Sequence, residues 1–231
     1  MSEGHWIVNT VISGHNLSFN MDTLITMWSV MLVLIIVAFI STRKLSIIPN
    51  KFQAFCETIM QFLWGLTDMM VKKDGRKHVP LVASLFLFIV SANLMGQLPL
   101  RLIHLQHGEI ASPTNDLNLT AALAIIVLVY YVTAGIMKKK AKFFLHGFDF
   151  ISIILALVEI LEMFTRPLTL ALRLFGNILA GEILVGTILG MCAYGAPLPA
   201  MFFEVLVAFV QALVFTMLTL VYISSATGEE H

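Results

Sequence analysis

The stretch LTLALRLFGNILAGEILVGTIL, residues 168–189, decides the fold of this chain. It is apolar and long enough to form a membrane-spanning helix, for which about 18 consecutive apolar residues suffice. Yet it contains Arg173, whose guanidinium remains charged at any ordinary pH. Placing that charge at mid-membrane depth costs at least ~2.5–3.5 kcal/mol, so such residues usually face a water-filled path or a partner carboxylate. Arg173 therefore predicts either the handling of an ion or mobile acid, or a structural ion pair within the chain.

Composition places the whole chain in the membrane. It is 58% hydrophobic and only 12% charged, which is typical of an all-α polytopic membrane protein. The net charge is zero, so no nucleic-acid partner is expected. The two cysteines, Cys56 and Cys192, are far apart and form no CxxC pair, which suggests neither a disulfide framework nor a metal site. No cofactor is expected.

Hydropathy along the chain predicts a single membrane domain, residues 1–231, with about five membrane helices. Residues 50–72 differ from the others, because apolar Phe52, Phe55 and Ile59 recur there at helical spacing among polar residues. This pattern is typical of an amphipathic helix at the membrane interface. The expected elements are a first span at 21–42, the interfacial helix at 50–72, spans at 79–100 and 117–137, and two long apolar segments at 149–190 and 198–225.

Charge asymmetry predicts the orientation of the chain. With the interfacial helix on the surface, most of the 14 Lys and Arg residues fall on one side of the membrane. The positive-inside rule makes that side cytoplasmic. Five crossings then place the N-terminus outside and the C-terminus in the cytoplasm.

The segment 149–190 is too long for an upright span. At ~1.5 Å per residue it would reach roughly 60 Å, about twice the hydrocarbon thickness. It either breaks near Pro167 or forms one strongly tilted helix. A single polar stripe along the segment favours the continuous helix, tilted and facing one partner. On an ideal helix, the polar residues within about 40° of Arg173 are Glu159, Glu162, Arg166 and Asn177.

The two long segments are expected to form an antiparallel hairpin that turns near Ala193. In that register Glu182 is level with Glu204, and Arg173 is level with Gln211. Two ionised carboxylates at one depth repel each other, which suits proton exchange. The alternative is a pair of unrelated buried acids.

Several motifs closely resemble subunit a of the F-type ATP synthases. The specific ones are the run from Pro167 to Glu182 and the run from Gln211 to Tyr222, and the resemblance extends over the whole chain. It implies a membrane stator component beside a rotating ring of c subunits. The further implied partners are b-type peripheral stalk subunits and the remainder of the ATP synthase, in a bacterial plasma membrane. No GxxxxGK[ST] run occurs, so ATP chemistry would belong to those partners.

The resemblance also implies roles for individual residues. Arg173 matches the family's essential arginine, and the coupling ion is expected to be a proton. Glu162 matches no general family acid; it is a further candidate for the inner side. The other implied residues are Glu182, with the Glu204 position, for the outer path; Gln211 and Asn177 beside the arginine; Asn93, Asp116 and Asn118 as outer polar lining; and Glu159 as the inner acid.

A secondary transporter is the rival interpretation. In such a protein Arg173 would bind an anionic substrate. Transporters of this kind often contain internal repeats and broken midplane helices, and the sequence shows no repeat.

Overall fold

The computed structural model describes residues 7–12, 15–43, 46–71, 75–97, 112–139, 150–191 and 197–228. Within them, five helices are long and apolar enough to cross a membrane by length and composition, and α2 is not among them. The predicted all-α polytopic class is confirmed. The elements in chain order are β1 (Ile7–Ile12), β2 (His15–Asn20), α1 (Met21–Arg43), α2 (Lys51–Met70), η1 (Gly75–Lys77), α3 (Val79–Gln97), η3 (Pro113–Asn115), α4 (Leu117–Lys139), α5 (Phe150–Met191) and α6 (Pro197–Thr227).

A small β-hairpin precedes α1, and the sequence analysis did not anticipate it. Strand β1 pairs with β2 in antiparallel register, with Ile7 opposite Asn20. The segment Ile-Val-Asn-Thr-Val-Ile is rich in β-branched residues, which favour extended structure. This segment is too short and too polar to span a membrane, so its hydropathy does not mark it as a structural element. The last part of the predicted second span, residues 98–100, lies outside the described residues.

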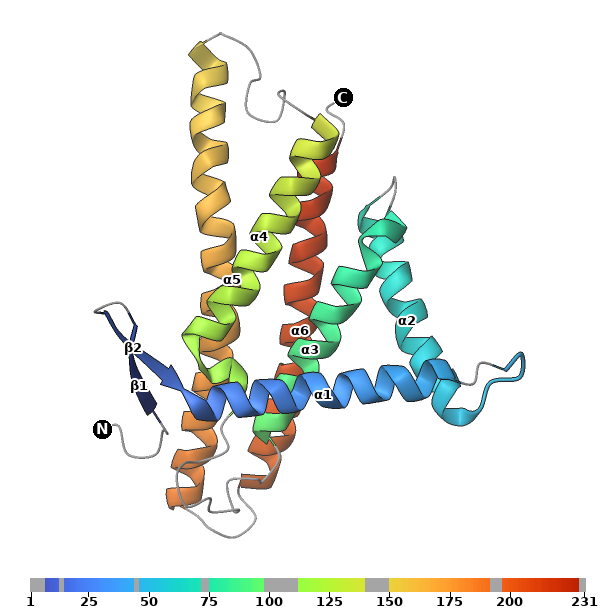
Figure 1. The fold of residues 1–231 in the computed structure, drawn as a ribbon, viewed down its shortest axis with the longest axis vertical. Helices are drawn as coiled ribbons and strands as arrows, with labels where there is room; N and C mark the ends of the chain where they lie inside the picture. Colours follow the sequence, from blue (N-terminus) through green and yellow to red (C-terminus); the bar gives the residue numbers. More distant parts are fainter. Residues whose placement is uncertain are drawn as a thin grey trace.

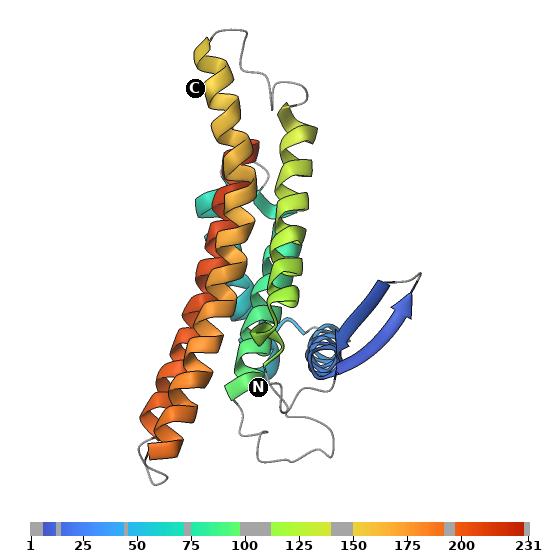
Figure 2. The same cartoon turned by 90° about the vertical axis from the view of Figure 1, so that its left-hand side faces the viewer.

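Helices α3, α4, α5 and α6 enclose the hydrophobic core. Figures 1 and 2 show α5 and α6 side by side and antiparallel, with α4 packed against α5 and α3 against α6. Small residues at the contacts let the helix axes approach closely. The buried side chains that represent the four helices are Ile89, Ala124, Val127, Ala171, Leu174, Ala212 and Phe215.

Helix α5 is continuous through Pro167. Proline has no N–H, so the carbonyl four residues earlier loses its intrahelical donor. That carbonyl belongs to Met163, and the Tyr131 hydroxyl of α4 donates a hydrogen bond to it at 3.5 Å. The neighbouring helix thus supplies the missing donor. Because α5 has 42 residues, it is ~63 Å long and can lie within a bilayer of ~30 Å hydrocarbon thickness only if it is strongly tilted.

Helix α1 crosses the α5–α6 hairpin instead of running alongside it. In Figure 1 it lies across the long helices, and in Figure 2 it is seen end-on while α5 and α6 remain vertical. Its apolar side chains are largely uncovered, including Trp28, Ile35 and Phe39. Asn50 caps the start of helix α2, where its side chain accepts a hydrogen bond from the Lys51 N–H at 2.8 Å. It packs against α3 through buried Leu63.

Candidate functional site

Arg173 stands on the uncovered side of α5. Its neighbours Ala171 and Leu174 are buried in the core, whereas Arg173 itself is exposed. Among the side chains that the structure describes, no carboxylate lies within ion-pair distance of Arg173. The internal ion pair considered from the sequence therefore has no partner in this part of the chain. The geometry leaves the guanidinium available to a group outside the subunit.

An amide pair joins α5 to α6 one helical turn from Arg173. The side-chain nitrogen of Asn177 donates to the Gln211 Oε1 at 2.6 Å. Gln211 is buried and Asn177 is exposed. Since Asn177 follows Arg173 by four residues, both lie on one face of α5. The hydrogen bond therefore fixes the two helices at the level of the arginine.

Two acids and an asparagine gather farther along the hairpin, and we call them the Glu182 group (Asn115, Glu182 and Glu204). Glu204 is only 7% exposed, and its carboxylate lies against the backbone of Gly181, the residue before Glu182. Asn115, in η3, donates from its side chain to the Glu182 Oε2 at 2.6 Å. Glu182 and Glu204 are thus brought to one place, as the hairpin register predicted.

Asn93 connects α3 to α6 and η3 from a fully buried position. Its Nδ2 donates to the Ala208 carbonyl at 3.3 Å, and its Oδ1 accepts from the Thr114 hydroxyl at 2.8 Å. Ser112 extends the network through Thr114 at 2.7 Å. These bonds hold η3, and with it Asn115, against the hairpin. The side chain of Asn93 therefore helps to fix the position of Asn115 in the Glu182 group.

Asp116 lies at the start of α4, where it accepts hydrogen bonds from several groups. Its Oδ1 accepts from the Asn118 backbone N–H at 2.9 Å and from the Asn118 side chain at 3.0 Å. Its Oδ2 accepts from Asn20 at 2.9 Å and from Thr23 at 3.2 Å. Asp116 therefore caps α4 and ties it to the start of α1. These four hydrogen bonds of Asp116 involve neither Glu182 nor Glu204.

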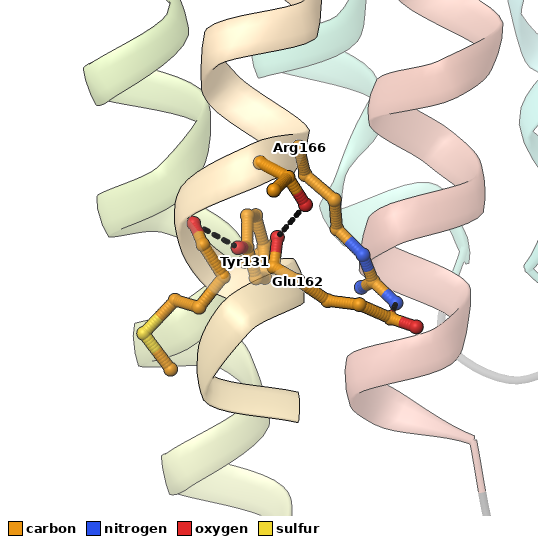
Figure 3. Close-up of polar contacts among 5 residues, drawn as sticks. Tyr131, Glu162 and Arg166 are labelled. Carbon is orange, nitrogen blue, oxygen red and sulfur yellow. Dashed lines mark hydrogen bonds and ion pairs between the residues drawn. The ribbon is translucent and has the colours of Figure 1, made fainter. Parts of the chain in front are cut away.

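A second polar cluster lies on the other side of Arg173, and we call it the Glu162 group (Glu162, Arg166 and Tyr222). Arg166 Nη2 forms an ion pair with Glu162 Oε2 on the preceding turn of α5 (Figure 3). The Arg166 guanidinium carbon lies 5.1 Å from the centre of the Tyr222 ring on α6. The side chain of Glu159, the predicted inner acid, lies outside the described residues.

Sequence reasoning did not single out Asn115, Tyr131 or Tyr222. Pro167 gives a partial signal for Tyr131, because a proline within a helix leaves a carbonyl in need of a donor. Which residue supplies that donor depends on how the helices pack. Asn115 and Tyr222 carry no local signal, since their contacts join residues 67 and 56 positions apart, respectively. Among the described residues, no cluster of His, Cys, Asp and Glu could hold a metal ion.

The fold and the site together define a polytopic α-helical membrane protein with polar side chains along two long antiparallel helices. Residues 24–224 match the family described as ATP synthase A chain. The protein described as ATP synthase subunit a of Gloeobacter violaceus is 46% identical over 216 residues, which cover 93% of this chain and 87% of that protein. The chain belongs to the ATP synthase A chain family. The resemblance seen in its motifs is confirmed.

Proposed function

We propose that the chain is the ion-translocating stator subunit of an F-type ATP synthase. In this proposal it supplies two offset aqueous half-channels and places Arg173 between them. The observation that carries the proposal is the position of Arg173, exposed on α5 between the Glu182 group and the Glu162 group. Family membership supports the same function. It also argues against the secondary transporter considered from the sequence.

The mechanism follows from the charge of Arg173. A ring carboxylate that passes the stator must lose its ion before it faces the guanidinium, because Arg173 stabilises the ionised carboxylate. The same charge repels a cation that would pass directly from one half-channel to the other. Ions then cross only when the ring rotates. Each unit charge that moves down 100 mV releases about 2.3 kcal/mol for that rotation.

The partners follow from the exposed face of α5. The stripe that carries Arg173 and Asn177 is not covered by this chain, and a ring of c subunits would lie against it. A b-type peripheral stalk would hold the subunit in place within the remaining complex. The asymmetry of the basic residues supports an orientation in which the Glu162 group faces the cytoplasm and the Glu182 group faces the outside of a bacterial plasma membrane. The coupling ion in this proposal is a proton.

The first test replaces the arginine in assembled complexes. We expect Arg173→Ala to abolish ATP synthesis and to permit passive proton leak, because ring acids could then carry protons between the half-channels by back-and-forth motion. Arg173→Lys should also impair coupling severely, since lysine lacks the planar fork and its fixed reach. ATP synthesis and proton flux are measured in vesicles that contain the assembled complex.

Arg43→Ala is the matched control, because it removes a guanidinium from the exposed end of α1. It should leave synthesis and flux at the parent level. ATP synthesis retained by Arg173→Ala would refute the proposal. Failure of that variant to assemble, with no leak through the protein that remains, would favour a structural role instead.

A further inference from the structure

Three helices meet at the turn of α5 that carries Glu162 (Figure 3). Arg166 binds Glu162 along α5, and its guanidinium lies over the Tyr222 ring of α6. The Tyr131 ring of α4 packs 6.0 Å from the Tyr222 ring, and its hydroxyl bonds the carbonyl of Met163. Both the backbone beside Glu162 and the cation that holds its carboxylate are therefore fixed by neighbouring helices.

The exposure of the ion pair is uneven. The Glu162 side chain is 47% exposed, whereas that of Arg166 is 26% exposed. The carboxylate thus remains accessible, while the guanidinium is covered between the acid and the aromatic ring. Arg166 engages Glu162 through Oε2, which leaves Oε1 for an incoming ion. A purely structural pair would gain nothing from keeping its acid accessible.

Glu162 also lies on the stripe that contains Arg173. On an ideal helix the two residues differ in direction by about 20° and are ~16 Å apart along the axis. The attraction within an ion pair removed from water often only offsets the cost of desolvating both charges, so stability alone is a weak reason for two charges at this depth. A position on the same face as the arginine is instead what a path leading away from the ring requires.

We propose that Glu162 is a proton-carrying acid of the inner path and that Arg166 is the residue that positions it. The ring carboxylate releases its proton, Glu162 Oε1 takes it up, and cytoplasmic water then receives it. Arg166, held over Tyr222, keeps the carboxylate directed along the α5–α6 seam throughout. This inference rests on the proposed function of Arg173 and extends it to a residue pair within the inner path.

The test measures voltage-driven proton flux through the membrane sector in inside-out vesicles from which the catalytic head has been removed. We expect Glu162→Ala to slow flux roughly tenfold, less than the loss of a sole proton-transfer group because Glu159 shares the path. Formate added to the cytoplasmic face should restore flux in that variant, and formate at the opposite face should not. Glu57→Gln, which removes an exposed acid from α2, is the control and should conduct like the parent.

Variants of Arg166 and Tyr222 test whether these residues position the Glu162 carboxylate or only pack the helices together. Tyr222→Phe keeps the ring face and should conduct normally, whereas Tyr222→Leu and Arg166→Gln should slow flux in the same direction as Glu162→Ala. Formate should also raise flux in Arg166→Gln, since the acid would then be present but misplaced. If Glu162→Ala does not assemble, Glu162→Gln and Glu162→Asp replace it, and the glutamine variant should conduct more slowly than the aspartate variant.

The outcomes distinguish this inference from the proposal on which it rests. If Arg173→Ala leaks while the Glu162 variants conduct like Glu57→Gln, the inference is wrong and the role of Arg173 stands. If formate fails to restore flux, or restores it equally from both faces, Glu162 and Arg166 are only a structural clamp. If Arg173→Ala synthesises ATP, the proposed function itself fails, whatever the Glu162 variants do.

Discussion

Gly181 has no side chain, and the Glu204 carboxylate occupies the space that a side chain there would fill. A Cβ atom on Gly181 would lie 2.7 Å from Glu204 Oε1 and 3.1 Å from its Cδ. Atoms this close cannot coexist, so one of them must move. The absence of a side chain at this residue therefore sets how closely Glu204 approaches the turn of α5 that carries Glu182.

We expect Gly181→Ala to displace the Glu204 carboxylate and to slow proton flux through the assembled complex. Overpacking at such a contact costs about 1–3 kcal/mol, which exceeds the ~1 kcal/mol that alanine gains over glycine within a helix. Flux is measured in the head-free vesicles. Gly186→Ala is the matched control, because a Cβ there meets nothing within 4 Å. Equal flux in the two variants would show that the Gly181 contact does not place Glu204.

At the scale of a helix, α5 depends on α4 for its continuity. Pro167 withholds a donor from the Met163 carbonyl, and the Tyr131 hydroxyl takes its place. The length of the apolar segment and its single polar stripe were sufficient to predict one continuous helix. The sequence could not name the residue that repairs the break, because that residue comes from another helix, 32 positions away.

A double-mutant cycle tests this repair. Tyr131→Phe should lower the free energy of unfolding by about 1 kcal/mol, because it removes the hydrogen bond to a partly buried carbonyl. In a Pro167→Ala background the helix regains its own N–H, so the same tyrosine substitution should cost much less. Denaturation of the purified subunit and hydrogen exchange around Met163 report the two costs. Equal costs in both backgrounds would mean that Tyr131 acts only through the packing of its ring.

The whole molecule combines one helix that crosses the others with a hairpin longer than the membrane is thick. Helix α1 runs across α5 and α6 (Figures 1 and 2), and α5 alone extends for ~63 Å. If α1 crosses the bilayer upright, the hairpin must lie closer to the membrane plane. Arg173 and the polar groups on either side of it would then be separated along the membrane as well as through it, which is the geometry that two offset half-channels need.

Depth measurements test this arrangement. Probes at Leu161 and Leu184, two exposed positions on α5, are ~35 Å apart along the helix axis. In a strongly tilted helix their depths in the bilayer should differ by less than half of that distance. Probes at Trp28 and Ile40 on α1 are ~18 Å apart along the axis and should differ in depth by nearly the full amount. Quenching by lipid-attached groups measures both, and a depth difference of ~35 Å on α5 would exclude the tilt.

The sequence by itself determined the all-α class and the five apolar helices, and it predicts an interfacial position for α2 and a functional role for Arg173. These features are local, because the length of an apolar segment and its helical periodicity depend only on consecutive residues. The sequence also predicted that Glu182 and Glu204 lie side by side, since residues at equal distances from the turn of an antiparallel hairpin face each other. The N-terminal β-hairpin was not predicted from the sequence, because two short strands give only a weak periodic pattern of apolar residues.

Only the tertiary structure decided which side chains touch. It joined Asn115 to Glu182 and placed Arg166 over Tyr222, and it enclosed Asn93 in a buried network. Each of these contacts joins separate helices, and its geometry depends on how their axes pack and on the rotamer that each side chain adopts. Periodicity along one segment contains no information about the direction from which a neighbour approaches. The charged residues of the proposed path could therefore be identified from the sequence, whereas the residues that contact them could be identified only from the packed helices.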